Sequence, residues 1–248
     1  MNPDWIKPEW PAPAHVHAVI TTRQGGFSQA PYHSLNVGDH VGDEPYAVAK
    51  NRHLVGDLLH LPTEPLWLQQ VHGVVVSGMN TSSCTPQADA AVAFKAKQVC
   101  VVMTADCLPV LFCDKAGTRV AAAHAGWRGL CDGVLEETVK ALDCQPHELL
   151  AWMGPAIGPS AFEVGSEVRA EFIQRDAQAE QAFVKSQFDG KWLGDLYQLA
   201  RQRLNNVGLS AIYGGGFCTY TDKARFFSYR RDNVTGRMAS LIWLSTIP

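Results

Sequence analysis

The sequence predicts an α/β fold in which helices are layered over a sheet. The middle of the chain carries a series of short apolar segments, several of them rich in valine, as is typical of buried strands. Segments with the apolar period of an amphipathic helix precede, interrupt and follow this series. A mixture of this kind is typical of folds that pack helices against a buried sheet.

The first elements lie before residue 62. Residues Val16–Thr22 are predicted to form a strand, which a polar turn containing Gly25 and Gly26 follows. Glu44–Leu59 is predicted to form a helix, because its apolar residues recur at helical spacing and Pro62 lies just beyond its end.

Six short apolar segments in the middle of the chain are predicted strands. They are Leu66–Leu68, Gly73–Val76, Ala90–Phe94, Val99–Met103, Leu108–Phe112 and Arg119–Ala123. Their length and their content of β-branched residues favour buried strands over helices. We therefore expect a sheet that is covered on its faces.

The last part of the chain alternates between the two kinds of element. Gly129–Leu142 is predicted to be a helix that opens directly after a strand, and Leu149–Met153 is predicted to be the next strand. Helices are expected at Glu167–Gln174 and Asp195–Asn206, and an apolar strand at Ala239–Leu244.

The composition describes a globular protein with one domain. The chain has 248 residues, of which 46% are hydrophobic and 18% charged. No repeat, low-complexity tract or linker divides it. The best candidate for a joint, Ser160–Ser166, carries Phe162 and Val164, which favours a packed loop over a tether. We expect a single catalytic domain over residues 1–248.

Charge and hydropathy argue against nucleic acid and membrane as partners. The net charge is −3, and lysine and arginine are scattered rather than clustered into a basic stripe. The longest apolar stretches, such as Val99–Met103 and Leu108–Cys113, fall well short of the ~18 residues that suggest a bilayer span. The first residues lack the layout of a signal peptide. We expect a cytoplasmic protein.

Three segments place a reactive side chain at the end of a predicted strand: Gln69–Gly73 with His72, Thr104–Cys107 with Cys107, and His124–Gly129 with His124. Two imidazoles and a thiolate suit zinc, and three protein ligands leave a fourth position for water or substrate, as in catalytic sites. Structural zinc sites usually have four protein ligands and CxxC pairs, which this chain lacks.

Each cysteine has to be judged from its surroundings. The chain contains seven cysteines, an odd number without regular spacing, which argues against a disulfide framework. For Cys107, a functional role and an inert buried role both remain open from spacing alone. Inert core positions are expected for Cys84, Cys100, Cys113, Cys131 and Cys144.

Two arginines are candidates for binding an anion. Arg23 lies beside the Gly25-Gly26 turn and Ser28, where a guanidinium and exposed backbone N–H groups could hold phosphate or a carboxylate. Arg128 lies near the start of a predicted helix, whose N-terminus favours anions. A tight turn and structural ion pairs explain the same residues equally well.

Together the motifs resemble those of the YfiH, or laccase-domain, family, in order from residue 21 to the C-terminus. The motifs are Thr21-Thr22-Arg23 with Gly25-Gly26 and Ser28, Leu35-Asn36-Val37-Gly38, His40-Val41-Gly42-Asp43, Gln70-Val71-His72-Gly73, Thr104-Ala105-Asp106-Cys107, His124-Ala125-Gly126-Trp127-Arg128-Gly129, Gly154-Pro155-Ala156-Ile157-Gly158-Pro159, Phe162-Glu163-Val164-Gly165, Cys218-Thr219-Tyr220 and Phe227-Ser228-Tyr229-Arg230-Arg231-Asp232.

The resemblance implies a four-layer α/β/β/α sandwich and a zinc site formed by His72, Cys107 and His124, which would also be the catalytic residues. It implies phosphorolysis of adenosine, inosine, guanosine and methylthioadenosine, and deamination of adenosine, in a family earlier named polyphenol oxidases. The small-molecule partners would be a purine nucleoside and phosphate. The residues expected to bind them are Arg23, Gly25, Gly26, Ser28, Asn36 and Arg128.

Three other functions remain open at this point. A metal-free hydrolase would use Cys107 as nucleophile and His124 as base. A copper-dependent phenol oxidase would use copper at the same site, because a His₂Cys site accepts copper. A multicopper oxidase needs more ligands than nine histidines with one His-x-His pair, His15 and His17, can supply. A zinc-binding module without catalytic activity is the last alternative.

Overall fold

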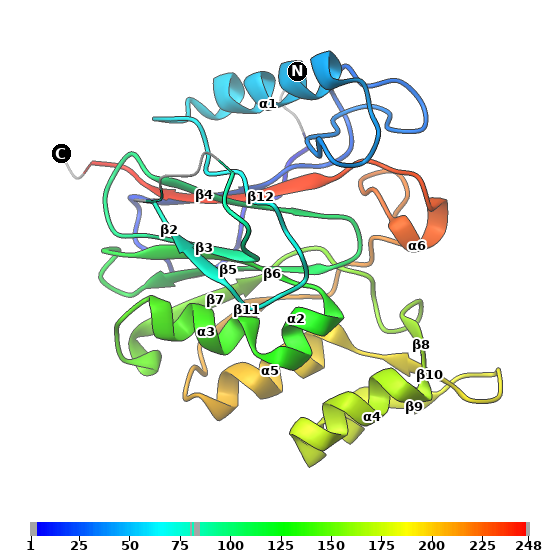
Figure 1. Ribbon diagram of the computed structural model, residues 1–248. Coiled ribbons are helices and arrows are strands. Elements are labelled where there is room, and N and C mark those ends of the chain that lie inside the picture. The colour runs from blue at the N-terminus through cyan, green and yellow to red at the C-terminus, as the bar shows by residue number, and fades with distance from the viewer. Residues whose placement is uncertain (1–3, 80, 82–84, 247–248) are drawn as a thin grey trace.

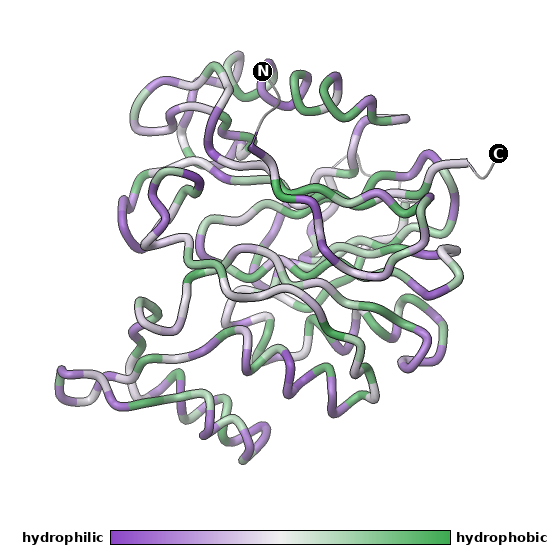
Figure 2. Tube along the Cα trace, turned by 180° about the vertical axis from the view of Figure 1, so that it is seen from behind, coloured by the Kyte–Doolittle hydropathy of each residue, from purple (hydrophilic) through white to green (hydrophobic). Residues whose placement is uncertain are grey.

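Two stacked sheets with helices on both outer faces form the body of the protein in the computed structural model, which describes residues 4–79, 81 and 85–246 (Figure 1). Hydrophobic residues gather along the stacked strands, and hydrophilic residues recur along the outer helices and loops (Figure 2). The order of the layers is helix, sheet, sheet, helix. The expected four-layer α/β/β/α sandwich is therefore confirmed.

The smaller of the two stacked sheets has three antiparallel strands. β12 (Met238–Leu244) lies in the middle, between β1 (Val16–Ile20) and β4 (Val99–Thr104). Helix α1 (Pro45–Leu59) covers the outer face, where Val55 is buried against residues of all three strands. This sheet brings the first and last strands of the described chain together.

The larger sheet has six strands in the order β11-β7-β5-β6-β3-β2. Their bounds are β11 (Ile212–Gly214), β7 (Leu149–Met153), β5 (Leu108–Asp114), β6 (Val120–Ala125), β3 (Ala90–Ala93) and β2 (Val76–Gly78). Helices α2 (Trp127–Asp132), α3 (Val134–Ala141) and α5 (Leu196–Asn206) cover its outer face. None of the helices that the described residues form is long and apolar enough to cross a bilayer.

The unbroken apolar runs in the sequence are explained by burial of the larger sheet on both faces. In β5, Leu111 and Cys113 pack in the core between the two sheets. Val110 and Phe112 point to the opposite face and pack under the helices. Because alternate side chains of a strand lie on opposite faces, a strand with two buried faces needs apolar residues at every position.

A third, small sheet lies beside the helical layer (Figure 1). It consists of β8 (Glu163–Gly165), β10 (Lys191–Gly194) and β9 (Phe183–Lys185), and α4 (Ser166–Arg175) packs on it. The helix α4 was predicted from the sequence, but none of these three strands was. The remaining short elements are the 3₁₀ helices Pro146–Glu148 and Ala177–Ala182 and the helix α6 (Tyr229–Asp232).

Three predicted elements differ from the structure. The predicted helix Gly129–Leu142 is two helices, α2 and α3, separated by Gly133 with a φ of 107°. The predicted strand Gly73–Val76 begins later, as β2, because the Gly73 N–H donates to a carboxylate instead of a neighbouring strand. The segment Leu66–Leu68 contributes an isolated bridge from Leu66 to Cys100 rather than a strand.

The expected core cysteines are buried at three of the described positions. Cys100, Cys113 and Cys131 are buried, whereas Cys144 is partly exposed. Burial raises the pKa of each of these thiols, which keeps them protonated at neutral pH. The prediction for Cys84 lies outside the described residues.

Candidate metal centre

Cys107 lies in the turn where the chain passes from one sheet to the other. The turn joins β4 of the smaller sheet to β5 of the larger one, and Asp106 in it has a φ of 87°. In the larger sheet, Pro109 of β5 is paired with His124 of β6. This register brings the cysteine turn next to the end of β6, and so to the imidazole of His124.

His72 reaches the same place from the loop before β2. Its backbone has a φ of 62°, and its N–H donates to Asp89 Oδ1 at 2.9 Å. The other carboxylate oxygen of Asp89 accepts the N–H groups of Gly73 at 2.7 Å and Val71 at 3.2 Å. One buried carboxylate at the start of β3 thus fixes the loop that carries His72.

The same carboxylate also orients His124. His124 Nδ1 lies 2.8 Å from Asp89 Oδ1, and Asp89 is fully buried. A histidine whose Nδ1–H is given to a carboxylate has its Nε2 available as an acceptor or a ligand. Asp89 therefore positions two of the three predicted site residues at once.

The three side chains converge within metal-binding range. The candidate ligand atoms of His72, Cys107 and His124 all lie within 4.8 Å of one another. Cys107 Sγ is 3.7 Å from His72 Nε2, and the two imidazole rings meet edge to face with centroids 4.8 Å apart. The three residues that the sequence analysis selected are thus brought together, and they form a possible metal site.

The electrostatics of the cluster favour the thiolate. Burial raises the pKa of Cys107, but the charges and hydrogen bonds of His124 and His72 outweigh burial and lower that pKa to about 6. Burial lowers the pKa of His124, but Cys107 and Asp89 outweigh it and raise that pKa to about 9. The metal-free cluster thus holds a thiolate on Cys107 and a proton on His124. A metal ion that binds here displaces the His124 proton.

Glycines in the segment after His124 make room for the cluster. A Cβ on Gly126 would lie 2.6 Å from Cδ2 of His72 and 3.1 Å from Sγ of Cys107. A Cβ on Gly129 would lie 2.7 Å from the Gly73 carbonyl oxygen. The spacing of the two glycines therefore reflects how closely the segment that starts α2 approaches the His72 loop.

The donor set fits a soft or borderline metal ion. Two imidazoles and a thiolate match zinc, and three protein ligands leave a coordination position open. The same donors also accept copper, because affinity for such ligands generally increases from zinc to copper. The identity of the metal does not follow from these three side chains.

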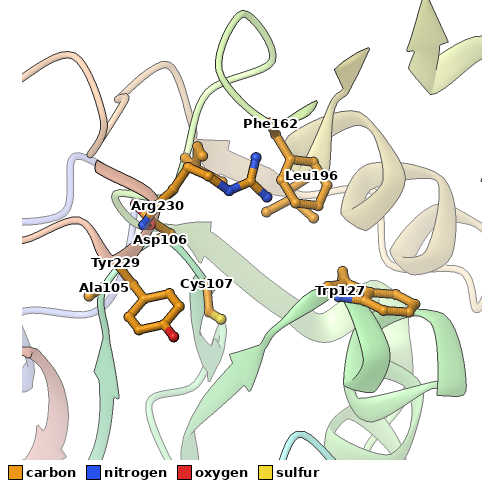
Figure 3. A pocket seen from close by; sticks show the side chains of 9 residues that line it. Ala105, Asp106, Cys107, Trp127, Phe162, Leu196, Tyr229 and Arg230 are labelled. Carbon is orange, nitrogen blue, oxygen red and sulfur yellow. The ribbon is translucent and has the colours of Figure 1, made fainter. Parts of the chain in front are cut away.

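Two cavities meet at Cys107. The first, of about 160 Å³, is mainly apolar, and Trp127, Phe162 and Leu196 line it with Arg230 reaching across from α6 (Figure 3). The second, of about 420 Å³, contains all three candidate ligands. Its other lining residues include His40, Gln70, Thr104 and Arg237. Ala105, Cys107 and Tyr229 line both cavities.

The predicted anion-binding residues lie outside the lining of these two cavities. Arg23 donates from Nε and Nη2 to the carbonyl of His33 and from Nη1 to that of Lys223. The guanidinium of Arg128 is exposed and lies over the ring of Trp127, 4.4 Å from its centroid. A role for either arginine in phosphate binding stays a prediction.

The other predicted residues of this group form the loop around Arg23. A Cβ on Gly26 would lie 2.4 Å from the Ser34 carbonyl oxygen, whereas Gly25 has a φ of 91° and open space around it. Ser28 is buried, and its Oγ accepts from Asn51. Asn36, also buried, accepts the backbone N–H of residue 237 with its Oδ1.

Neither Asp89 nor Arg237 was predicted as a site residue from the sequence. A signal for Asp89 was present, since it is the lone charged residue in the apolar run Ala88–Phe94, and a buried carboxylate needs partners. Arg237 had no such signal, because it is one of several arginines near the end of the chain.

Comparison with known proteins extends over nearly the whole chain. The family model described as "Multi-copper polyphenol oxidoreductase laccase" matches residues 17–245. Purine nucleoside phosphorylase PA4543 of Pseudomonas aeruginosa is 56% identical over 240 residues, which cover 97% of this chain and 98% of that protein. Purine nucleoside phosphorylase YfiH of Escherichia coli is 57% identical over 240 residues, covering 96% and 98%.

Solved structures with the same fold are also found. Protein NMB0706 of Neisseria meningitidis superposes with a TM-score of 0.93 at 51% identity, covering 98% of this chain and all of that one. Protein YfiH of Bacillus licheniformis gives a TM-score of 0.87 at 31% identity, covering 93% of each chain. Both matches extend over more than nine-tenths of this chain.

Proposed function

The chain belongs to the multi-copper polyphenol oxidoreductase laccase family, and on that premise we propose that it is a zinc-dependent purine nucleoside phosphorylase. The names of its relatives support the reaction, and the His72, Cys107 and His124 cluster supports the metal. The proposed substrates are adenosine, inosine, guanosine and methylthioadenosine, each with phosphate. Residues 1–248 act as one catalytic domain in this proposal.

The observation that carries the proposal is the junction of two unlike cavities at Cys107. The first cavity offers apolar and aromatic side chains, including Trp127 and Phe162, which suit a flat purine base. The second offers polar and basic side chains, which suit a ribose and phosphate. A nucleoside that spans the junction would have its glycosidic bond next to the His-Cys-His cluster.

Phosphorolysis requires one bond to form and one to break. A phosphate oxygen bonds to C1′ of the ribose, the bond from C1′ to the purine nitrogen breaks, and its electron pair leaves with the base, which takes up a proton. The sugar is positively charged in the transition state, so the protein mainly has to place phosphate and hold the base. Asp89 contributes by fixing His124 and the His72 loop.

The proposal includes deamination of adenosine at the same site. Zinc, when bound, supplies Lewis-acid chemistry, which serves the replacement of the 6-amino group by water more directly than it serves phosphorolysis. His72 and His124, held by Asp89, would bind that ion with their imidazole nitrogens, together with the Cys107 thiolate.

Two alternatives have their own support. The description of the family and the His₂Cys donors favour copper-dependent phenol oxidation as a second candidate. The low pKa of Cys107 next to His124 is what a metal-free cysteine hydrolase would need.

One experiment separates these three functions. The protein is loaded with zinc or copper, or treated with a chelator, and each form is incubated with inosine and inorganic phosphate. We expect ribose 1-phosphate from the zinc form, loss of product after chelation, and loss in His72→Ala. No product from the intact protein, or equal product from His72→Ala, would defeat the proposal. The copper form is also incubated with a phenol, whose rapid turnover would favour the oxidase. Full cleavage of inosine by the chelator-treated protein would favour the metal-free hydrolase.

A further inference from the structure

Arg237 lies in the wall of the second cavity, the one that contains His72, Cys107 and His124, and hydrogen bonds to nearby groups hold it in place. Its N–H donates to Asn36 Oδ1 at 2.8 Å. Its Nη1 donates to the carbonyls of Thr235 at 3.0 Å and Gly236 at 3.1 Å. Of the three guanidinium nitrogens, only Nη1 donates a hydrogen bond. Nε and Nη2, which form the fork of the guanidinium, have no acceptor among the described residues.

The loop that carries Asn36 is shaped to receive this arginine. A Cβ on Gly38 would lie 2.8 Å from Cγ of Arg237, so a larger residue at position 38 would push the arginine away. Gly38 itself is held by Asn36, whose side chain binds both its N–H and its carbonyl. The motif Leu35-Asn36-Val37-Gly38 therefore supports the aliphatic stem of Arg237.

The charge of Arg237 has no ion-pair partner within the described part of the chain. Two carboxylates of this region, Asp106, which interacts with the Arg237 charge, and Asp39, the neighbour of the cavity residue His40, are engaged with other partners. Asp106 accepts from Thr219 with Oδ1 and from the Arg230 N–H with Oδ2. Asp39 is paired with Arg52 at 3.2 Å. Burial lowers the pKa of Arg237, but a guanidinium stays protonated in proteins.

Thr104 supplies a second, independent observation in the same cavity. Its side chain is 2% exposed, and its Oγ1 has no hydrogen-bond partner among the described residues. Thr104, the last residue of β4, is paired with Met238, the first residue of β12, so Arg237, which directly precedes β12, lies next to the end of β4. A buried hydroxyl without a protein partner usually forms its hydrogen bond with a water molecule or a ligand. His40 lines the same cavity; its Nδ1 lies 3.6 Å from Asp39 Oδ1, and its other ring nitrogen, Nε2, can donate to an anion when it carries a proton.

We propose that Arg237, Thr104 and His40 form the subsite that binds inorganic phosphate in this cavity. A guanidinium fork matches two oxygens of a tetrahedral oxyanion, and a hydroxyl and an imidazole can bind the others. The cavity also contains His72, Cys107 and His124, so phosphate held there lies beside the proposed position of the ribose. The assignment rests on the proposed phosphorolysis, and it gives the phosphate a different arginine from Arg23.

The direct test is the binding of inorganic phosphate to the zinc-loaded protein, measured by isothermal titration calorimetry. Arg237→Gln is expected to raise the Kd for phosphate on the order of tenfold or more. Arg237→Lys keeps the positive charge but lacks the guanidinium fork. Its Kd for phosphate should therefore be intermediate between those of the wild type and Arg237→Gln. Thr104→Val keeps the shape and removes only the hydroxyl, which predicts a loss of a few-fold.

Two controls make the result specific. Arg175→Gln removes the same charge from an exposed arginine on α4 that is paired with Asp132, and it should leave the Kd unchanged. Arg23→Gln tests the competing arginine. Loss of phosphate binding in Arg23→Gln, with Arg237→Gln, Arg237→Lys and Thr104→Val all binding as the wild type does, would overturn the subsite. Absence of phosphate binding by the wild type would overturn it as well.

Failure of the subsite and failure of the phosphorylase can be told apart. If the wild type makes ribose 1-phosphate and none of the Arg237 and Thr104 variants changes the KM for phosphate, the subsite is wrong and the enzyme proposal stands. If Arg237→Gln loses phosphate binding although the wild type makes no ribose 1-phosphate, the subsite stands and the enzyme proposal fails.

Discussion

Replacing Asp89 by asparagine keeps the size of the side chain but removes its charge and half of its acceptor capacity. In the native protein Oδ1 accepts from the His72 N–H and from His124 Nδ1, and Oδ2 accepts from the N–H groups of Gly73 and Val71. An amide offers one oxygen and one NH₂ group. Whichever way it is turned, its NH₂ faces two N–H donors that have lost their acceptor.

The size of the effect follows from these contacts. Two hydrogen bonds to a charged group are lost in a fully buried place, at about 1.5–3 kcal/mol each. If the NH₂ group of the asparagine faces His124, Nδ1 of His124 loses its acceptor and the imidazole ring is no longer fixed. If it faces Gly73 and Val71, the His72 loop is released. Loss of such an outer partner typically weakens metal binding by about 10–100-fold, which is about 1.4–2.7 kcal/mol.

The measurement is a zinc competition titration against a chromophoric chelator, with urea unfolding of the metal-free proteins beside it. Asp114→Asn is the matched control, because Asp114 is a buried aspartate that accepts from Thr118 and Arg119 at the other end of β5. Both variants should lose stability, and only Asp89→Asn should lose zinc affinity. Affinities of the two variants within about threefold of each other would refute the positioning role of Asp89.

Three further predictions concern the same region. Gly126→Ala should weaken zinc binding by about tenfold or more while the protein stays folded, because the new Cβ would lie 2.6 Å from the His72 ring. The same zinc titration measures this change, and a zinc affinity equal to that of the wild type would contradict it. Tyr197→Phe removes the hydroxyl that accepts the buried Ala156 N–H at 2.9 Å, so urea unfolding should show a loss of about 1–3 kcal/mol, and an unchanged free energy would count against it. The pKa of His124 is raised to about 9, and its proton must leave before a metal ion binds. The apparent zinc affinity should therefore rise about tenfold per pH unit from pH 7 to 9, and a zinc affinity that does not change with pH would refute this.

The sequence was informative wherever burial alone decides structure. β5 was predicted because both of its faces are buried, so that every residue from Leu108 to Phe112 is apolar. The break at Gly133 was missed because the apolar period continues through it on both sides. The small sheet was missed because its strands are three or four residues long and partly exposed, which leaves no period to detect.

The candidate site was only partly predictable, for a similar reason. His72, Cys107 and His124 stand out as reactive residues at strand ends, and family resemblance grouped them. Their meeting in space depends on the pairing of Pro109 with His124, which no local pattern encodes. The role of Asp89 depends on backbone N–H groups of a distant loop, and side-chain type alone does not reveal such contacts.

The central place of β12 has a consequence for how the protein is made. Residues 238–244 are the last strand of the described chain, yet they are paired on one side with β1 and on the other with β4. During synthesis, β1 and β4 emerge first and have to wait, with their inner edges unpaired, until β12 leaves the ribosome. Arg237 and the Cys107 turn therefore come together only in that final step, so that a chain interrupted before β12 has neither the completed sheet nor the cavity that Cys107 and Arg237 both line.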